Sequence, residues 1–335
     1  MVEFVGAWGK LRENRPADSL KAPFVIVDAE AFRRHGDYFE DEYNLYDRGS
    51  TYLWTKTDVC NTAEEGVAYA SEKCALAGYA TPVVTDFAEL DRLDASKAEF
   101  VILPPLGKDT PDSVRQSVRR LHARGVGLLI SEEAVGLEDL FGVKRDPDGP
   151  VKVSRIAGDD GFAHKLSFAR YVADGAEPVV FGDDDGGVPI VVHHRTATGR
   201  TVFVNVPPTV VRRSPVRDGY TFGQCAVSER MAEAYRQAFA YLSPAPAVKS
   251  ERGSITATRT KTGDVIVTVG DDSPIYNDAS VYPAGFRFTV SAPGIGRCDI
   301  ETEADHTVVA KTDDKVVLRT WTERHDTLFF KFKRK

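Results

Sequence analysis

The segment 33–60 concentrates side chains that could contact a ligand. The residues of this segment that we expect to bind a ligand are Tyr38, Tyr43, Tyr46, Asp47, Tyr52 and Trp54. An aromatic ring offers an apolar face on which a sugar can stack, and a carboxylate accepts hydrogen bonds from hydroxyl groups. We therefore expect this segment to contact a carbohydrate or another subunit. The alternative is a long ordered loop whose rings pack on its own sheet or on a sister chain.

A second group of reactive residue types, Ser131, Glu132 and Glu133, follows the apolar run 128–130. A serine beside two acids could suggest hydrolase chemistry, but the GxSxG frame of a serine nucleophile is absent. The commoner interpretation is a helix cap with acids in the first turn, where the helix dipole favours negative charge.

The sequence contains no pattern typical of a metal or cofactor site. His193 and His194 are adjacent in a predicted strand, so their side chains point to opposite faces. The acidic turns 183–185 and 271–272 lack the spacing of a calcium-binding loop, and solvated turns are the simpler interpretation. The four cysteines are far apart, with no CxxC pair, which argues against a zinc site or a disulfide scaffold: Cys60, Cys74, Cys225 and Cys298. We expect no cofactor, no metal and no catalytic residue set.

Composition excludes several classes of protein. The chain has 335 residues, with 43 lysines and arginines against 50 acids, for a net charge of −7. An acidic surface repels phosphate backbones, so nucleic acid is not an expected partner. No apolar run reaches the roughly 18 residues that a membrane helix needs, and residues 1–10 show no secretory signal. We expect a cytoplasmic protein without a membrane partner, unless the sequence is cut from a longer one.

The first half alternates between short apolar runs and amphipathic segments. Strands are predicted at 24–27, 81–84, 100–103 and 126–130, with helices at 62–77 and 110–123. Strands and helices that alternate at this spacing favour a mostly parallel sheet with helices on both faces.

The second half changes character in two steps. Shorter strands are predicted across 151–211, followed by an amphipathic helix at 228–242 and a Ser-Pro-Ala-Pro linker at 243–246. Beyond it, apolar residues alternate with a period of two, which predicts an antiparallel β-sandwich. The predicted organisation is an entry segment at 1–21, an α/β domain at 22–245 and a sandwich domain at 249–335.

Six segments of the α/β half carry a resemblance to a known family: Asp58 to Glu65, Ala77 to Tyr79, Phe100 to Pro105, Arg124 to Gly127, Leu140 to Val143 and Thr198 to Phe203. On these segments the α/β half resembles the class I glutamine amidotransferase-like, flavodoxin-type domain. More closely, it is similar to the β-galactosidase trimerisation domain, which follows the catalytic barrel of certain bacterial glycoside hydrolases and precedes a small β-sandwich. The resemblance implies a flavodoxin-like, mostly parallel sheet flanked by helices, followed by an antiparallel β-sandwich.

Two departures from this family bear on activity. Active amidotransferases place a cysteine at the strand-to-helix elbow and a histidine at the end of a late strand. Here Ser131, Glu132 and Glu133 form a degenerate elbow, and Asn205 stands near the late position. The resemblance therefore implies that the triad is absent. The 21 residues before the first domain also cannot hold a (β/α)₈ barrel of about 250 residues.

Three functional hypotheses remain open at this stage. In the first, the chain is a non-catalytic accessory and oligomerisation portion of a β-galactosidase-like glycoside hydrolase, with its own copies (a dimer or trimer) or a catalytic barrel as partner. In the second, it is a stand-alone carbohydrate-binding module that uses Tyr38 to Trp54. In the third, it is a hydrolase with an unrecognised site, built from Asp28, Glu30 or Glu132 with a histidine that folding brings near.

Overall fold

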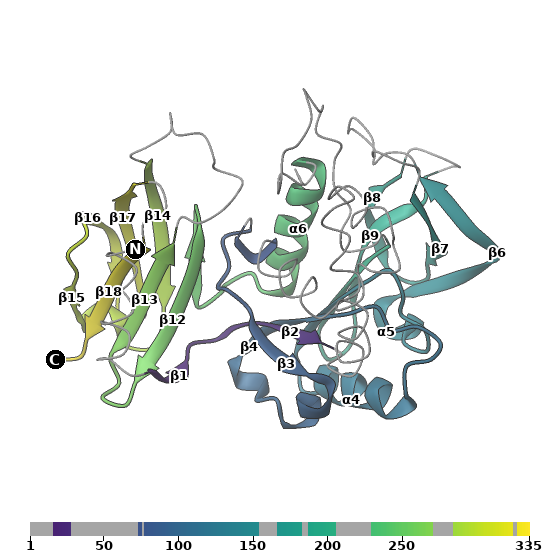
Figure 1. The fold of residues 1–335 in the computed structure, drawn as a ribbon, viewed down its shortest axis with the longest axis horizontal. Coiled ribbons are helices and arrows are strands. Elements are labelled where there is room, and N and C mark those ends of the chain that lie inside the picture. The colour runs from purple at the N-terminus through teal and green to yellow at the C-terminus, as the bar shows by residue number, and fades with distance from the viewer. Residues whose placement is uncertain are drawn as a thin grey trace, which may run out of the picture.

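The fold consists of two β-rich units that lie side by side (Figure 1). The computed structural model describes residues 16–27, 73–75, 77–153, 166–182, 187–205, 229–270, 284–323 and 327–335. One unit surrounds a seven-stranded sheet, and the other, drawn in green to yellow, is built of two smaller sheets.

The seven-stranded sheet has the strand order β3-β2-β4-β5-β10-β9-β8. Its strands are β2 (Ala22–Val27), β3 (Val83–Asp86), β4 (Ala98–Leu103), β5 (Gly127–Ser131), β8 (Glu177–Phe181), β9 (Pro189–Arg195) and β10 (Arg200–Val204). The five strands from β3 to β10 in this order run parallel, whereas β9 and β8 are antiparallel to their neighbours. The predicted strands at 24–27, 100–103 and 126–130 correspond to β2, β4 and β5.

Each face of this sheet is covered by helices, because its central strands are apolar on both sides. Along β5, Leu128 and Ile130 pack into one core, and Leu129 packs into the other. The first core lies under α4 (Asp112–Ala123), α5 (Glu138–Phe141) and the 3₁₀ helix η2 (Phe87–Arg92), with η3 (Ala95–Lys97) close by. The second lies under α6 (Glu229–Leu242). No helix in the described ranges has both the length and the apolar character needed to cross a membrane.

A two-stranded antiparallel sheet extends from this unit. It pairs β6 (Val143–Val153) with β7 (Leu166–Ala173). Tyr171 of β7 returns to the core, where its ring packs on Phe203 with the centroids 4.8 Å apart.

The second unit is a sandwich of two antiparallel sheets around its own apolar core. One sheet has the order β1-β12-β13-β18-β15 and the other β11-β14-β17-β16. The strands are β1 (Pro16–Ser19), β11 (Val248–Ser250), β12 (Ser254–Thr260), β13 (Val265–Gly270), β14 (Ala284–Ser291), β15 (Asp299–Glu301), β16 (His306–Thr312), β17 (Lys315–Thr322) and β18 (Thr327–Lys333), with the 3₁₀ helix η6 (Ile295–Arg297) before β15. Alternate residues of β14 and β17 point inward, which is the period of two that the sequence shows.

The two units are joined by strand β1 and by buried hydrogen bonds. Strand β1 pairs with β12 of the sandwich before the chain enters β2 of the other unit. The buried carboxylate of Glu99 on β4 accepts hydrogen bonds from the hydroxyl of Ser243 and from the amide of Ala247, at 2.7 Å for Ala247. The Tyr79 hydroxyl donates to the Ser243 carbonyl at 2.7 Å. These bonds hold the 243–247 linker against the seven-stranded sheet.

The predicted fold class is wrong for this chain. Of the described residues, 51% lie in strands and 20% in helices; the seven-stranded sheet ends in the antiparallel strands β9 and β8, and the other three described sheets are antiparallel, so the structure as a whole is not a flavodoxin-like parallel sheet flanked by helices. The prediction extended the early strand–helix alternation too far, since β6 to β9 satisfy their backbone groups against antiparallel strands instead. The flavodoxin-like assignment is therefore wrong, the amidotransferase-like assignment has no support, and the predicted β-sandwich character is supported. The domain boundaries stay predictions.

Gly78 provides a test of the contact between the units. It has φ +75°, and a Cβ there would lie 2.0 Å from the Ser250 carbonyl oxygen. We expect Gly78→Ala to lower the free energy of unfolding by about 3 kcal/mol or more, since the left-handed backbone and the overlap both cost energy. Gly175 is the matched control, because it has φ +79° and no atom of the described chain within 4 Å of such a Cβ. Gly175→Ala should cost only about 1–2 kcal/mol in the same urea titration, and equal losses would contradict the close contact.

Candidate functional site

The candidate site lies at the carboxyl edge of the parallel strands. Ser131 ends β5 and is paired with Val204 of β10, while Ile130 is paired with Leu103 of β4. The carboxyl ends of three neighbouring strands therefore meet at one edge, which is where open sheets with helices on their faces bind ligands.

Glu132 turns the chain sharply at this edge. Its φ is +67°, and it is the one non-glycine residue in the described ranges with a positive φ. The Glu133 amide donates to the Ser131 carbonyl at 2.8 Å, which closes a three-residue turn centred on Glu132. A γ-turn with a left-handed central residue is rare and strained, and such strain is concentrated at functional sites. The three residues therefore form a turn at the strand end, and α5 begins only at Glu138.

The Glu132 carboxyl group has an unusual acidity. The backbone amide of Glu132 donates to the Val204 carbonyl at 2.8 Å, which fixes the turn against β10. Burial of the side chain, and then the charge of Glu133, raise the pKa of Glu132 from 4.5 to about 7. A carboxyl group with this pKa is partly protonated near neutral pH, so it can both donate and accept a hydrogen bond.

Two buried polar atoms beside Glu132 have no hydrogen-bond partner in the part of the chain that the structure describes. They are Oγ of Ser131 and Oδ1 of Asn205, on residues that are 1% and 0% exposed. Asn205 is otherwise held in place: its amide donates to the Ile190 carbonyl at 2.7 Å, and its Nδ2 donates to the Pro189 carbonyl at 3.0 Å. Because a buried unpaired polar atom is costly, the two atoms are a second local departure from an optimal fold beside the strained turn.

Glu133 connects the turn to the loop after β4. Its carbonyl accepts a hydrogen bond from the Leu106 amide at 2.9 Å, and the Leu106 carbonyl accepts one from the Val135 amide at 2.8 Å. The Glu133 carboxylate lies against Gly107, where a Cβ would be 2.7 Å from its Oε2 atom. The two loops at the sheet edge are thus paired through their backbones, and glycine leaves room for the Glu133 carboxylate.

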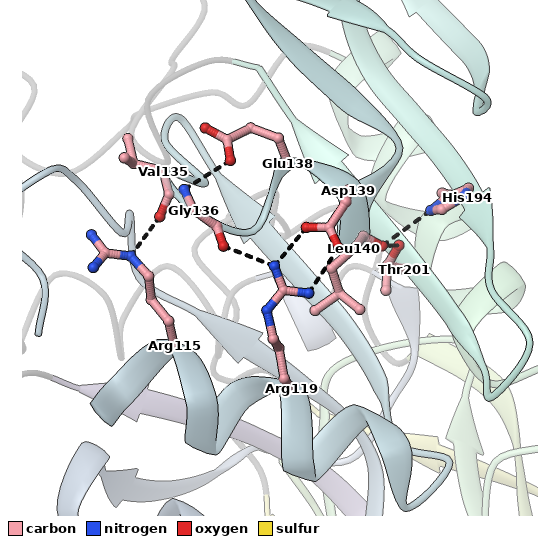
Figure 2. A network of polar contacts seen from close by, with 9 residues as sticks. All are labelled: Arg115, Arg119, Val135, Gly136, Glu138, Asp139, Leu140, His194 and Thr201. Atoms are coloured by element: carbon pink, nitrogen blue, oxygen red, sulfur yellow. Dashed lines mark hydrogen bonds and ion pairs between the residues drawn. The ribbon is translucent and has the colours of Figure 1, made fainter. Parts of the chain in front are cut away.

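Arg115 on α4 donates hydrogen bonds to the backbone of both loops. Its Nε donates to the Val135 carbonyl at 2.7 Å (Figure 2), and its Nη2 donates to the Gly107 carbonyl at 2.8 Å. The side chain is only 12% exposed, so these charge-assisted bonds are made in a partly desolvated place. Arg115 is therefore a positioning residue for the turn at Glu132.

The same network continues along the segment that leads to α5. One helical turn beyond Arg115, Arg119 donates to both carboxylate oxygens of Asp139, at 2.6 and 2.8 Å, and to the Gly136 carbonyl at 2.9 Å (Figure 2). The Leu140 carbonyl at the far end accepts from the Thr201 hydroxyl at 2.9 Å and lies 3.1 Å from Nδ1 of His194. Segment 133–140 is therefore tied to α4 and to β9 and β10.

No described imidazole or thiol is available to act as a base or nucleophile at the turn. His122 contacts the Val126 carbonyl, His194 the Leu140 carbonyl, and His193 stacks on Tyr241. His306 lies in the sandwich, and Cys74 and Cys298 are buried in the cores. No group of three metal-ligating side chains occurs within the described ranges. The described edge thus offers carboxyl, hydroxyl and amide groups, which suit the binding of hydroxyl groups.

Several predicted site residues lie outside the described residues. These are Tyr38, Tyr43, Tyr46, Asp47, Tyr52 and Trp54, together with Asp28, Glu30 and the acidic turns 183–185 and 271–272. The structure places Ser131, Glu132 and Glu133 together at the sheet edge. Sequence reasoning missed the positioning role of Arg115. A possible signal was the pair of glycines, Gly107 and Gly136, in the loops that Arg115 contacts.

The raised pKa of Glu132 makes the stability of the chain depend on pH. Between pH 4.5 and about 7 the folded state binds more protons at this group than the unfolded state does, so its contribution to stability is lost as the pH rises. In the unmodified chain we expect the free energy of unfolding to fall by about 2–3 kcal/mol from about pH 5 to about pH 8, and we expect Glu132→Gln to remove this fall. Urea unfolding at the two pH values measures it. Glu133→Gln should retain most of the fall, because burial is the larger cause. Identical pH profiles for Glu132→Gln and the unmodified chain would contradict this account.

The backbone of Glu132 gives a second test. Glycine adopts a positive φ without strain, so we expect Glu132→Gly to raise the free energy of unfolding by roughly 1 kcal/mol at about pH 5, where the carboxyl group is protonated. Glu133→Gly should lower it by about 0.5–1 kcal/mol, because there glycine adds only freedom to the unfolded chain. Thermal unfolding followed by circular dichroism measures both. A loss of stability in both variants would show that the turn is not strained.

Solved structures similar to this chain include a β-galactosidase and a mannosidase. No family model matches the sequence, and no curated protein matches it. The polyextremophilic β-galactosidase from the Antarctic haloarchaeon Halorubrum lacusprofundi is 16% identical, with a TM-score of 0.46, over 95% of this chain and 41% of that chain. An exo-β-1,4-mannosidase from Opitutaceae bacterium strain TAV5 is 16% identical, with a TM-score of 0.33, over 44% of this chain and 27% of that chain. The chain thus spans less than half the length of either structure, and both structures are glycoside hydrolases.

Proposed function

We propose that this chain is a non-catalytic accessory portion of a β-galactosidase-like glycoside hydrolase, and that its partner is a catalytic barrel domain or further copies of itself. The single observation that carries the proposal is the turn at Glu132. It has the strain and the position of a functional corner, yet its polar groups are those that hold a hydroxylated ligand rather than attack one. A cytoplasmic location belongs to the same proposal.

The carboxylates at the corner support an accessory role. Glycoside hydrolysis generally needs two carboxyl groups that face each other across the bond, about 5–9.5 Å apart. The backbone of Glu133 is paired with Leu106, and its carboxylate lies against Gly107. Glu132 is its neighbour in the same turn, so the two carboxyl groups come from one short segment and not from two sides of a cleft.

One observation favours a second candidate, a hydrolase in which Glu132 is the general acid. Its pKa of about 7 is what such a role requires near neutral pH. In that case the second group would come from outside the described residues, and the activity would depend on Glu132 being protonated.

Turnover and assembly together test the proposed function. We expect the purified chain to release no nitrophenol from aryl β-galactosides or aryl β-mannosides between about pH 5 and pH 8, where a general acid like Glu132 would be protonated over part of the range. Light scattering should show a dimer or trimer that persists on dilution, as assembly through a specific interface requires. The Glu132→Gln variant is the matched control for turnover.

Three results would contradict the proposal. Turnover that disappears in Glu132→Gln would establish the hydrolase instead. A monomer that binds a galactoside in calorimetry, with the binding lost in Trp54→Ala, would establish a stand-alone binding module. A monomer that binds neither a galactoside nor a separately expressed barrel domain would leave the chain without an accessory role.

A further inference from the structure

We propose that the outward face of the four-stranded sheet in the sandwich, with Arg236 in the middle of α6, binds an acidic saccharide. This site is separate from the corner at Glu132, and it goes beyond the proposed function. The inference is based on an exposed ring, a set of cationic side chains and a cavity that occur together on one face.

Strands β14 and β17 present their outward residues as two cross-strand pairs. Arg287 is opposite Arg319, and Gly285 is opposite Trp321. Phe286, Phe288 and Leu318 point inward to the core, so the residues between them face outward. Two like charges directly opposite each other on a sheet are unfavourable. Within the described ranges neither guanidinium has an ion-pair partner, so the pair is positioned to receive an anion.

Trp321 supplies a flat apolar surface next to this pair. Its ring lies over Gly285, where a Cβ would be 3.0 Å from Nε1, and it is 37% exposed. The Arg319 guanidinium carbon is 5.3 Å from the centroid of the same ring. Because glycine has no side chain, the ring can lie close to the strand and keep its outer face open. A sugar ring can stack on such a face while a guanidinium donates two parallel hydrogen bonds to a carboxylate.

The cavity beside the pair extends the positive surface toward α6. It has a volume of about 480 Å³ and is lined by Arg236 of α6, Lys249 of β11 and Arg287, with Thr289 and Val317 on its floor. Its one acid, Glu251, accepts a hydrogen bond from the backbone amide of Arg287 at 2.8 Å.

Arg236 is paired with Glu233 at 2.8 Å, so four positive side chains, Arg236, Lys249, Arg287 and Arg319, are accompanied by two acids, on a chain whose net charge is −7. The local charge favours an anion, the volume fits one or two sugar units, and the ring distinguishes a saccharide from a simple anion.

Isothermal titration calorimetry with trigalacturonate tests this proposal on the full chain. We expect trigalacturonate to bind and maltotriose, a neutral trisaccharide, to bind at least about tenfold more weakly, because it lacks the carboxylates. We expect binding to be about tenfold weaker in each of three variants, Arg287→Gln, Arg319→Gln and Trp321→Leu. Arg287→Lys should weaken binding less, because lysine keeps the positive charge and loses only the planar guanidinium. Binding should also weaken as the salt concentration rises from about 0.05 to about 0.5 M.

The controls separate this site from general charge effects and from misfolding. Arg92, whose side chain is 79% exposed in the other unit, is the matched control, and Arg92→Gln should leave binding unchanged. Thermal unfolding of each variant shows that the sandwich is intact. Absent binding, equal binding of maltotriose, or equal losses in Arg92→Gln would each overturn the proposal. Tripolyphosphate that binds as tightly as trigalacturonate, with no effect of Trp321→Leu, would mean a general anion site and would also overturn it. Glu132→Gln should not change this binding, so the result of the calorimetry is independent of the proposed function.

Discussion

Strand β5 is buried along its whole length, between β4 on one side and β10 on the other. Its residues alternate between two apolar cores, so neither a shift nor a rotation of the strand is possible without exposing apolar surface. The end of β5 is consequently fixed in space, and the chain must reverse at Glu132 to reach segment 133–140. The strain of that residue is a consequence of the packing, and the hydrogen bond from its amide to the Val204 carbonyl helps to keep it.

The surroundings of Glu132 show how the fold supports a strained turn at the end of a buried strand. Arg115 bonds the carbonyls of the two loops, and Arg119 with Asp139 anchors the following segment to α4. Arg115 gives this support from a partly desolvated place and the Arg119–Asp139 pair gives it at the surface, whereas the corner itself keeps a half-buried, partly protonated carboxyl group and two buried polar atoms without a described partner. Rigid support behind adaptable polar groups is what a site for a hydroxylated ligand requires.

The connection between the two units has similar consequences for the sandwich. The pairing of β1 with β12, and the hydrogen bonds of Glu99 and Tyr79 to the linker, join the sandwich to the seven-stranded sheet. Arg236 of α6 thereby comes to line the same cavity as Arg287 of β14. A cationic cavity is thus formed from elements that are separated in the chain, and it lies on a face of the sandwich that the corner at Glu132 does not use.

The sequence by itself determined the elements whose signal is local. The apolar run 100–103 and the period of two in the second half are visible because strand burial and strand alternation depend only on neighbouring residues. The tertiary structure alone decided which distant strands pair and in which direction, since the backbone groups of β5 can be satisfied by a parallel or an antiparallel neighbour and its partner β10 lies far along the chain. It also decided the left-handed backbone of Glu132 and the opposition of Arg287 and Arg319. Both depend on packing and register between segments far apart in the chain, which no local pattern of residue types encodes.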